Sequence, residues 1–292
     1  MSRAGHEEHP GPKDKTDFSR VYDTLYACYG PQHWWPGDTP FEVMVGAVLT
    51  QNTAWTNVEK AIANLKGTSK NSLKPRWLRW ECAQNAHVLR VHSAFSRISA
   101  LPSRLDRIFR SALKAQHHLD AARIAATPPE TLAEWLKPSG YFNIKARRLR
   151  NFCVWYVAQG ELKSLSKLDT TTLRHALLSV NGIGPETADD ILLYAFHRPV
   201  FVIDAYTRRL FSRLGLVRGD EGYEALRHTF ETALSGAKSH PVAVVRLFNE
   251  YHALIVSHAK NVCRKHPLCA GCCLAHVCPS GDTWCAPNST LQ

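Results

Sequence analysis

The sequence contains no apolar run that approaches the length of about eighteen residues needed to cross a membrane, and no convincing run of alternating polar and apolar residues. The first absence argues against a membrane protein and the second against a β-sheet fold. The N-terminal residues also lack the pattern of a secretion signal, which argues against a disulfide-stabilised secreted protein. We therefore expect a helical protein, which would be cytoplasmic and associated with the nucleoid if its source is a prokaryote.

Acidic residues are scarce relative to basic ones. The 292 residues include 25 Asp and Glu against 36 Lys and Arg, which gives a net charge of +11 and indicates a polyanionic partner. Residues 67–114 carry three Lys and seven Arg against Glu81 and Asp106, or +8 of that +11. This segment also contains Trp77 and Trp80. It is either an added arm that binds DNA phosphates and stacks on bases, or a solvated insertion without a function.

A turn with two glycines joins two predicted helices. The first helix covers 171–180 with Asp169 or Thr170 as its N-cap, and the second begins at Pro185, a residue that suits the first helical position. The turn itself is Asn181-Gly-Ile-Gly184, where the glycines allow a ligand to come close to the backbone. The second helix presents unpaired N–H groups and a positive dipole end. The pattern predicts an anion-binding site, but an ordinary corner between two helices would share it.

Four cysteines near the C-terminus are separated by five, two and five intervening residues: Cys263, Cys269, Cys272 and Cys278. Zinc modules usually show two close ligand pairs joined by a longer loop, whereas one compact run of four thiolates suits an iron–sulfur cluster. We expect a cluster, with zinc and a disulfide pair as the alternatives.

Together with Asp204, which follows the glycine turn by about twenty residues, these motifs resemble the endonuclease III superfamily of helix-hairpin-helix DNA glycosylases. The hairpin, the aspartate and the cysteine run occur in the family's order, and the resemblance covers most of the chain. It implies an all-α fold of two lobes, a six-helix barrel and a lobe that binds a 4Fe-4S cluster. The family spacing favours Cys272 over Cys273 as the third ligand, although the first two cluster cysteines are one residue closer here than in the family.

The resemblance also implies a domain organisation. The predicted segments are a disordered tail (1–17), the cluster lobe (18–35 and 197–282), the barrel (36–196) with its hairpin at 171–196 and the basic insertion at about 67–114, and a second tail (283–292). The substrate cleft would lie between the lobes. Asp204 would stand on one side of it, opposite the segment from Gln51 to Trp55.

Asp204 is the predicted catalytic residue. An aspartate at this point is also a good helix N-cap, and the two roles are compatible. When a glycosidic bond breaks, the sugar passes through an oxocarbenium-like state that a nearby carboxylate stabilises, or the carboxylate activates water. The base must also be flipped out of the duplex. The resemblance therefore implies a monomeric enzyme that releases a damaged base from double-stranded DNA.

Family members that also cut the strand carry a lysine in the first turn of the second hairpin helix, where the amine forms a Schiff base. The matching residue here is Glu186, which cannot form that adduct. This predicts a monofunctional glycosylase that uses water, with Lys145 as the alternative amine. Two other functions stay open: a bifunctional glycosylase and AP lyase acting on oxidised pyrimidines, as in endonuclease III, and a DNA-binding module that has lost catalysis.

Further motifs resemble the bacterial 3-methyladenine glycosylase subgroup: Trp34-Trp35-Pro36, the run from Leu49 to Trp55, and 138–143. That subgroup also has a glutamate at the position of Glu186. The resemblance implies that Trp34, Pro36 and Trp55 enclose the flipped base, although Trp34 would otherwise be interpreted as packing between lobes. An alkylated purine is cationic, so an indole face attracts it by roughly 0.5–2 kcal/mol per contact. The adenine glycosylase branch of the superfamily carries a glutamate in the helix that corresponds to 45–47. The absence of a glutamate there argues against adenine-mismatch repair.

Several polar groups are expected to contact DNA, although each could instead be a surface or capping group. They are the backbone amides of Gly182, Ile183 and Gly184, the hydroxyl of Thr187, the charges of Arg208 and Arg209, and Gln51 or Asn52 as the wedge that fills the space left by the flipped base.

Overall fold

The computed structural model describes residues 15–32, 34, 37–67, 118–235 and 240–281. The predictions for Pro36, for the tail at 283–292 and for nearly all of the basic insertion lie outside the described residues. Residues 1–14 of the predicted N-terminal tail also lie outside them. The last residues of that tail are described, and they already belong to the first helix, which begins at Lys15.

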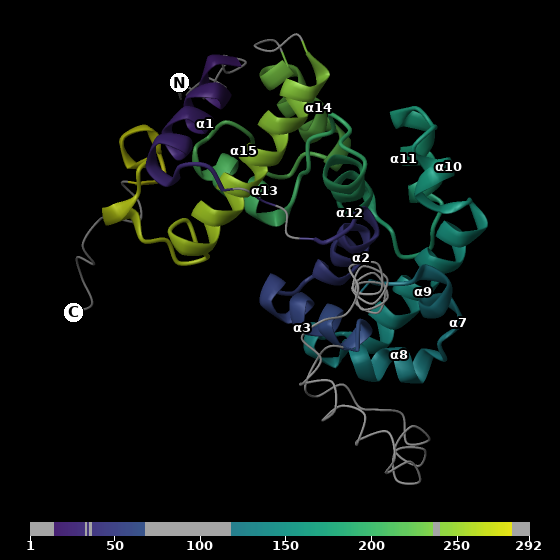
Figure 1. Cartoon of the computed structure of the whole chain (residues 1–292). Helices are drawn as coiled ribbons and strands as arrows, with labels where there is room; N and C mark the ends of the chain where they lie inside the picture. The colour runs from purple at the N-terminus through teal and green to yellow at the C-terminus, as the bar shows by residue number, and fades with distance from the viewer. Residues whose placement is uncertain (1–14, 33, 35–36, 68–117, 236–239, 282–292) are drawn as a thin grey trace, which may run out of the picture. The chain divides into compact units, whose positions relative to one another are not determined.

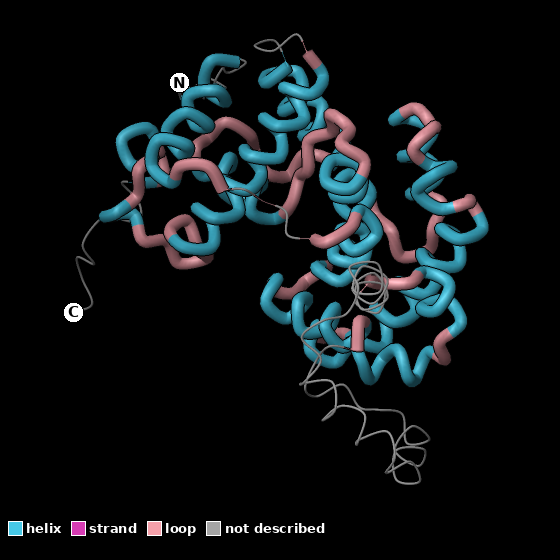
Figure 2. Tube along the Cα trace, in the orientation of Figure 1, coloured by secondary structure: helices cyan, strands magenta, loops and turns pink. Residues whose placement is uncertain are grey.

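Every regular element in the described part of the chain is helical, and the elements are joined by turns and loops (Figure 2). The predicted all-α fold is therefore confirmed. None of the described helices is both long and apolar enough to span a bilayer.

The chain divides into two compact units. The terminal unit comprises Met1–Trp35 and Ala188–Gln292, and the central unit comprises Pro36–Thr187. The boundary between Thr187 and Ala188 falls within the second helix of the predicted hairpin, whereas the sequence placed the lobe boundary after residue 196.

The central unit is built around two helices, α2 and α9. Its elements are α2 (Pro40–Thr50), α3 (Trp55–Leu65), α7 (Ala121–Ala126), α8 (Pro129–Leu136), the 3-10 turn η2 (Lys137–Ser139), α9 (Phe142–Ala158), α10 (Glu161–Leu165), α11 (Thr170–Leu178) and the start of α12 (Pro185–Asp190) (Figure 1). Residues Phe41 to Leu49 of α2 are all buried, as expected for a helix that is apolar on every side. Helix α9 packs against α2, α7 and α8.

The terminal unit is built around the long helix α15. Its elements are α1 (Lys15–Tyr29), the end of α12, the π turn η3 (Ile191–Ala195), α13 (Ala205–Arg213), α14 (Tyr223–Ser235), α15 (Pro241–Asn261) and the 3-10 turns η4 (Cys269–Gly271) and η5 (Ala275–Val277). Helices α1 and α13 and the π turn pack against α15. Stacked and edge-on aromatic rings fill the core, among them Phe18, Phe201, Phe211, Phe230 and Tyr251.

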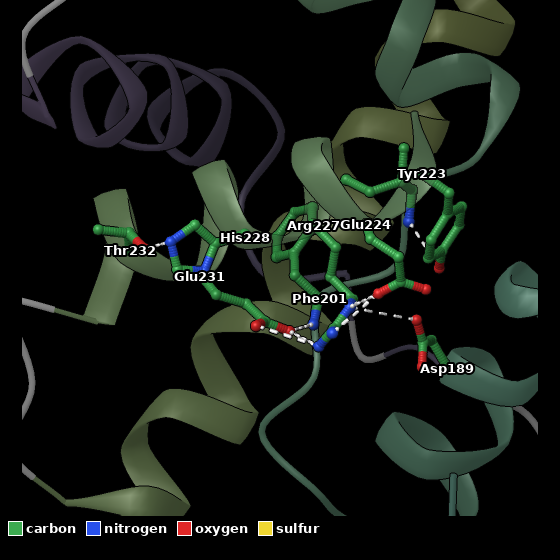
Figure 3. Close-up of polar contacts among 9 residues, drawn as sticks. Asp189, Phe201, Tyr223, Glu224, Arg227, His228, Glu231 and Thr232 are labelled. Atoms are coloured by element: carbon green, nitrogen blue, oxygen red, sulfur yellow. Dashed lines mark hydrogen bonds and ion pairs between the residues drawn. The ribbon is translucent and has the colours of Figure 1, made fainter. Parts of the chain in front are cut away.

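A charged network anchors the end of α12 to α14 (Figure 3). Asp189 is fully buried, and its carboxylate lies 3.8 Å from Nε of Arg227. Arg227 also pairs with Glu224 and Glu231, each at 3.0 Å. Glu231 in turn accepts a 3.0 Å hydrogen bond from the amide of Phe201. The buried carboxylate is thus paired with a guanidinium, as a charge in an apolar core requires.

Candidate functional site

The hairpin has the predicted local structure. Oδ1 of Asp169 caps α11 by accepting a 2.9 Å hydrogen bond from the amide of Thr172, and Pro185 is the first residue of α12. Gly182 has φ of +101°, and a Cβ at this residue would collide with the side chain of Arg148. A Cβ at Gly184 would meet nothing within 4 Å. The turn therefore needs glycine at 182 for its conformation, while position 184 is open to a ligand.

The amide of Ile183 is already used within the turn. It donates a 3.0 Å hydrogen bond to the carbonyl oxygen of Val180, and the Ile183 side chain is buried. This bond competes with the predicted phosphate contact of Ile183. Gly182 and Gly184 are therefore the stronger candidates among the three predicted amide donors.

Gln51 is tied to the hairpin by both ends of its amide group. Its Nε2 donates to the carbonyl oxygen of Gly182 at 3.1 Å and to Oγ1 of Thr187 at 2.9 Å, and its Oε1 accepts a hydrogen bond from Arg148. The Thr187 hydroxyl is buried in this contact. By contrast, Asn52 is exposed and has φ of +55°. Of the two candidate wedges, the structure favours Asn52, because the Gln51 side chain is engaged elsewhere.

Lys145 is buried beneath the C-terminal end of α2. It is 1% exposed, and its Nζ donates to the carbonyl oxygens of Leu49 at 2.9 Å and Ser139 at 2.6 Å. Burial, assisted by the neighbouring charge of Arg148, lowers the pKa of Lys145 to about 8. The amine thus satisfies backbone acceptors just before the Gln51 loop. These contacts give Lys145 a structural role.

Tyr141 is a candidate functional residue that the sequence analysis did not single out. It precedes α9, is 68% exposed, and has φ of +46° although it is not glycine. Such a conformation in a bulky residue is strained by about 1–3 kcal/mol and often marks a functional position. Arg147 and Arg150 of the same helix are exposed, and Asn151 donates to the carbonyl oxygen of Asn181 in the hairpin at 3.3 Å. The only sequence signal was the Gly-Tyr pair after a proline.

Asp204 caps α13 and is buried in the terminal unit. Its Oδ1 accepts a 2.6 Å hydrogen bond from the amide of Thr207, and its Oδ2 lies 3.5 Å from Nε2 of His252. Burial alone would raise the pKa of Asp204, but the neighbouring His252 ring and the Thr207 amide together hold it below its ordinary value. Trp34 stacks on the His252 ring with centroids 6.0 Å apart and an interplanar angle of 3°. The aspartate is therefore a buried, ionised carboxylate beside an aromatic wall.

His252 and Tyr194 were not singled out in the sequence analysis. The Tyr194 hydroxyl lies 2.5 Å from Nδ1 of His252, and both side chains are buried. No short motif marks them, since they come together only through the packing of η3 on α15. Trp55 belongs to the central unit, where its Nε1 donates to Oε1 of Glu59 at 2.9 Å. That Trp55 and Asp204 face one cleft stays a prediction.

The four predicted cluster cysteines line one pocket of the terminal unit: Cys263, Cys269, Cys272 and Cys278. The other pocket walls are largely apolar, and the four thiols are free of disulfides. Cys273 is absent from this lining and instead lies beside Cys28. Within the described residues, no three His, Cys, Asp or Glu side chains are close enough to hold a single metal ion. The four thiols thus share one pocket, and the cluster that would bind there stays a prediction.

Two side chains contact the sulfur atoms of this pocket. Nε2 of His258 lies 3.6 Å from Sγ of Cys272, and its Nδ1 lies 2.8 Å from the Tyr29 hydroxyl. Burial lowers the pKa of His258 to about 4, so the ring is neutral near pH 7. Arg213 places NH1 3.3 Å from Sγ of Cys263. Arg213 is a charged donor that suits a negatively charged thiolate, and His258 donates to Cys272 in the tautomer that carries its proton on Nε2.

Arg208 and Arg209 are engaged inside the terminal unit. Arg208 donates to the carbonyl oxygen of Glu221 at 2.7 Å. Arg209 donates to the carbonyl oxygens of Cys263 at 2.9 Å and Ala259 at 3.0 Å, where it caps the end of α15 and holds the cysteine loop. Arg209 therefore has a structural role, and the DNA contacts of both arginines stay predictions.

Comparison with known families and proteins agrees with these features. The family model of the HhH-GPD superfamily of base excision DNA repair proteins matches residues 45–235. A candidate DNA repair glycosylase of Methanocaldococcus jannaschii is 36% identical over 264 residues, which cover 89% of this chain and 95% of that protein. Endonuclease III of Sulfolobus acidocaldarius is 30% identical over 159 residues, which cover 53% of this chain and 65% of that enzyme.

Solved structures show the same fold. The 3-methyladenine DNA glycosylase of Helicobacter pylori, bound to 1,N6-ethenoadenine, superimposes with a TM-score of 0.59 at 25% identity, covering 85% of this chain and 98% of that chain. An endonuclease III in complex with DNA superimposes with a TM-score of 0.61 at 17% identity, covering 93% of this chain and 98% of that chain.

Proposed function

The chain belongs to the HhH-GPD superfamily of base excision DNA repair proteins and is a DNA glycosylase, and we propose that it removes an alkylated purine from double-stranded DNA with water as the nucleophile. The observation that carries the proposal is the buried, ionised Asp204 beside Trp34 and His252. A carboxylate that stays charged inside a protein can stabilise positive charge on a deoxyribose.

The chemical steps need few groups. The bond between C1′ and the purine nitrogen breaks, and its electron pair leaves with the base. The sugar becomes oxocarbenium-like, and the Asp204 carboxylate stabilises that charge. A water oxygen then bonds to C1′, and the carboxylate accepts the proton that the water loses. A methylated purine leaves as a neutral base, so no strong general acid is required.

Hydrolysis without strand cleavage is supported by the nature of residue 186 and by the burial of Lys145. Glu186 stands in the first turn of α12, is exposed, and cannot form a Schiff base. Lys145, the alternative amine, is 1% exposed and donates to two backbone carbonyls. We therefore propose a monofunctional enzyme.

An alkylated purine is favoured as substrate by the aromatic wall and by one neighbour. Trp34 lies flat against His252, next to the carboxylate. A cationic methylpurine gains roughly 0.5–2 kcal/mol from an indole face, which a neutral base does not. The H. pylori neighbour at 25% identity is a 3-methyladenine glycosylase. Trp55 and Pro36 remain the other proposed members of the pocket.

DNA would be held chiefly by the central unit. We assign phosphate binding to the amides of Gly182 and Gly184 at the start of α12. Asn52 would fill the space of the flipped base, and the exposed, strained Tyr141 would contact the duplex beside it. The enzyme would act as a monomer.

The four cysteines fit a 4Fe-4S cluster. All four line one largely apolar pocket, and His258 and Arg213 offer donors to two of the sulfur atoms. When bound, the cluster would cross-link the loop 263–278 and add a redox-active centre. The residues of this chain, and not the cluster, carry the hydrolysis proposed above.

The test is single-turnover base release from duplexes that contain a methylated purine, thymine glycol, uracil or an adenine mismatch. We expect the methylated purine to be released fastest. Faster release of thymine glycol would contradict the aromatic-pocket assignment and favour an oxidised pyrimidine as substrate. Tight DNA binding without release from any duplex would contradict the proposed enzyme activity and favour a binding module.

A further inference from the structure

His252 links three buried groups of the candidate site. It lies on α15 and is 4% exposed, with Nε2 3.5 Å from Oδ2 of Asp204 and Nδ1 2.5 Å from the hydroxyl of Tyr194. The indole of Trp34 covers one face of the ring. The residues of this arrangement belong neither to the glycine turn nor to the cysteine loop 263–278.

The Tyr194 contact selects which ring nitrogen carries the proton. Burial raises the pKa of Tyr194 well above its ordinary value, so the phenol keeps its hydrogen. When that hydroxyl donates to Nδ1, the neutral imidazole carries its own proton on Nε2. The N–H of His252 then points toward Asp204.

Nε2 makes no completed hydrogen bond within the described part of the chain. A buried N–H without an acceptor is unfavourable, and the Asp204 carboxylate lies 3.5 Å from Nε2. Catalytic hydrogen bonds are often long without substrate and shorten in the reacting complex. A small movement of either side chain would complete this bond.

We propose that His252 is the positioning residue of Asp204: its Nε2–H holds the carboxylate oriented and ionised during base release, and Tyr194 fixes the ring in the tautomer that does so. The proposal rests on the proposed catalytic role of Asp204. Tyr194 reaches the ring from the π turn η3, and extra residues of this kind inside helices often occur at functional sites.

The groups around Asp204 determine how the rate depends on pH. His252 faces it from α15, Tyr194 approaches from η3, and the amide of Thr207 donates from α13. Asp190 and Glu250 act on Tyr194 through their charges. Because His252 lowers the pKa of Asp204, the carboxylate stays ionised to lower pH in the wild type. Loss of His252 raises that pKa, so activity is lost at a higher pH as the solution is acidified.

The test compares pH profiles of single-turnover release from a duplex that carries one N7-methylguanine or N3-methyladenine. These bases are already cationic. The loss of rate on the acidic side of the pH profile, the acidic limb, therefore reports a protonation of the enzyme and not of the substrate. His252→Phe keeps a ring against Trp34 but removes both nitrogens, whereas His252→Gln keeps an N–H donor. The control is His228→Gln on α14, a histidine that is exposed.

For His252→Phe we expect a rate at neutral pH lower by about tenfold or more, and an acidic limb higher by about one pH unit. His252→Gln should shift the limb less, and Tyr194→Phe should give an intermediate shift because the tautomer is no longer fixed. His228→Gln should match the wild type. If the Phe variant does not fold, the Gln and Tyr194 variants still decide the question.

An unchanged acidic limb in the variants that fold, whatever their rate, would overturn the positioning role and leave His252 a core residue. Asp204→Asn, measured in parallel, separates this inference from the proposed function. If Asp204→Asn is inactive while the His252 variants keep the wild-type limb, only the inference fails. If Asp204→Asn retains full activity, the proposed function fails.

Discussion

At the residue scale, Asp204 caps α13 and has a proposed catalytic role, and two substitutions separate the two. Asparagine keeps an oxygen that can accept from the Thr207 amide, so Asp204→Asn should preserve the α13 cap and lose only the charge. Alanine loses both. We expect base release to fall by about 100-fold or more in each variant. In urea unfolding, the free energy of unfolding of Asp204→Ala should be about 1 kcal/mol lower than that of Asp204→Asn. Equal stability of the two would contradict the capping role.

Lys145 is expected to stabilise the fold and to take no part in chemistry. Lys145→Met leaves the carbonyls of Leu49 and Ser139 without their donor, so the free energy of unfolding should fall by about 2 kcal/mol or more. Lys60→Met, at an exposed position of α3, is the matched control and should change stability little. Borohydride should trap no adduct with the wild type. A trapped adduct that disappears in Lys145→Met would show that the amine does react.

Single residues differed in how far the sequence could assign them. The capping role of Asp204 could be predicted from its place before α13, whereas its catalytic role follows from the family order and stays a proposal. His252 could not, because a histidine within the apolar stretch of α15 has the same sequence pattern whether or not a carboxylate faces it. The sequence also gave no sign that Arg209 donates to carbonyl groups at the end of α15, and its DNA contact stays a prediction.

At the scale of single elements, the hairpin contains two glycines, Gly182 and Gly184, whose substitutions can be compared. Gly182→Ala introduces a Cβ at φ of +101° and against Arg148, so we expect both stability and DNA affinity to fall, with a stability loss of about 1 kcal/mol or more. Gly184→Ala has free space, so its thermal unfolding should be close to wild type. If its amide approaches a phosphate, Gly184→Ala should still weaken DNA binding. Normal affinity in Gly184→Ala would remove this residue from the proposed contact.

Elements specified by local chemistry were predictable. Asp169, the two turn glycines and Pro185 mark the hairpin because capping and turn conformation depend on neighbours in sequence. The change from α12 to the π turn Ile191–Ala195 was not, since no glycine or proline marks it. That turn packs against α15, so it depends on tertiary contacts that periodicity does not contain.

For the whole molecule, the cluster assignment predicts different results for two adjacent cysteines. Cys272 lines the pocket with the other three thiols, whereas Cys273 lies beside Cys28. Cys272→Ser should therefore lose most bound iron and the broad visible absorbance of a cluster, while Cys273→Ser should keep both. Iron content and absorbance of the purified variants are the measurement. The reverse pattern would mean that Cys273, and not Cys272, is the third ligand. Stoichiometric zinc in the purified protein would contradict the cluster assignment.

The fold class of the whole molecule could be predicted because the chain lacks alternating strands and carries three motifs in the family's order. The division into units could be anticipated only approximately, since α12 belongs to both and its buried Asp189 is paired with Arg227 of α14. The orientation of side chains such as Gln51, which bonds the hairpin, depends on long-range contacts that a single sequence does not specify.

The most direct test of the central claim is strand cleavage of a methylated-purine duplex by the wild type and Asp204→Asn, analysed before and after alkali. The account predicts wild-type breaks only after alkali, and almost none with Asp204→Asn. Breaks without alkali would contradict the water-driven mechanism, and full activity of Asp204→Asn would contradict the assignment of the carboxylate.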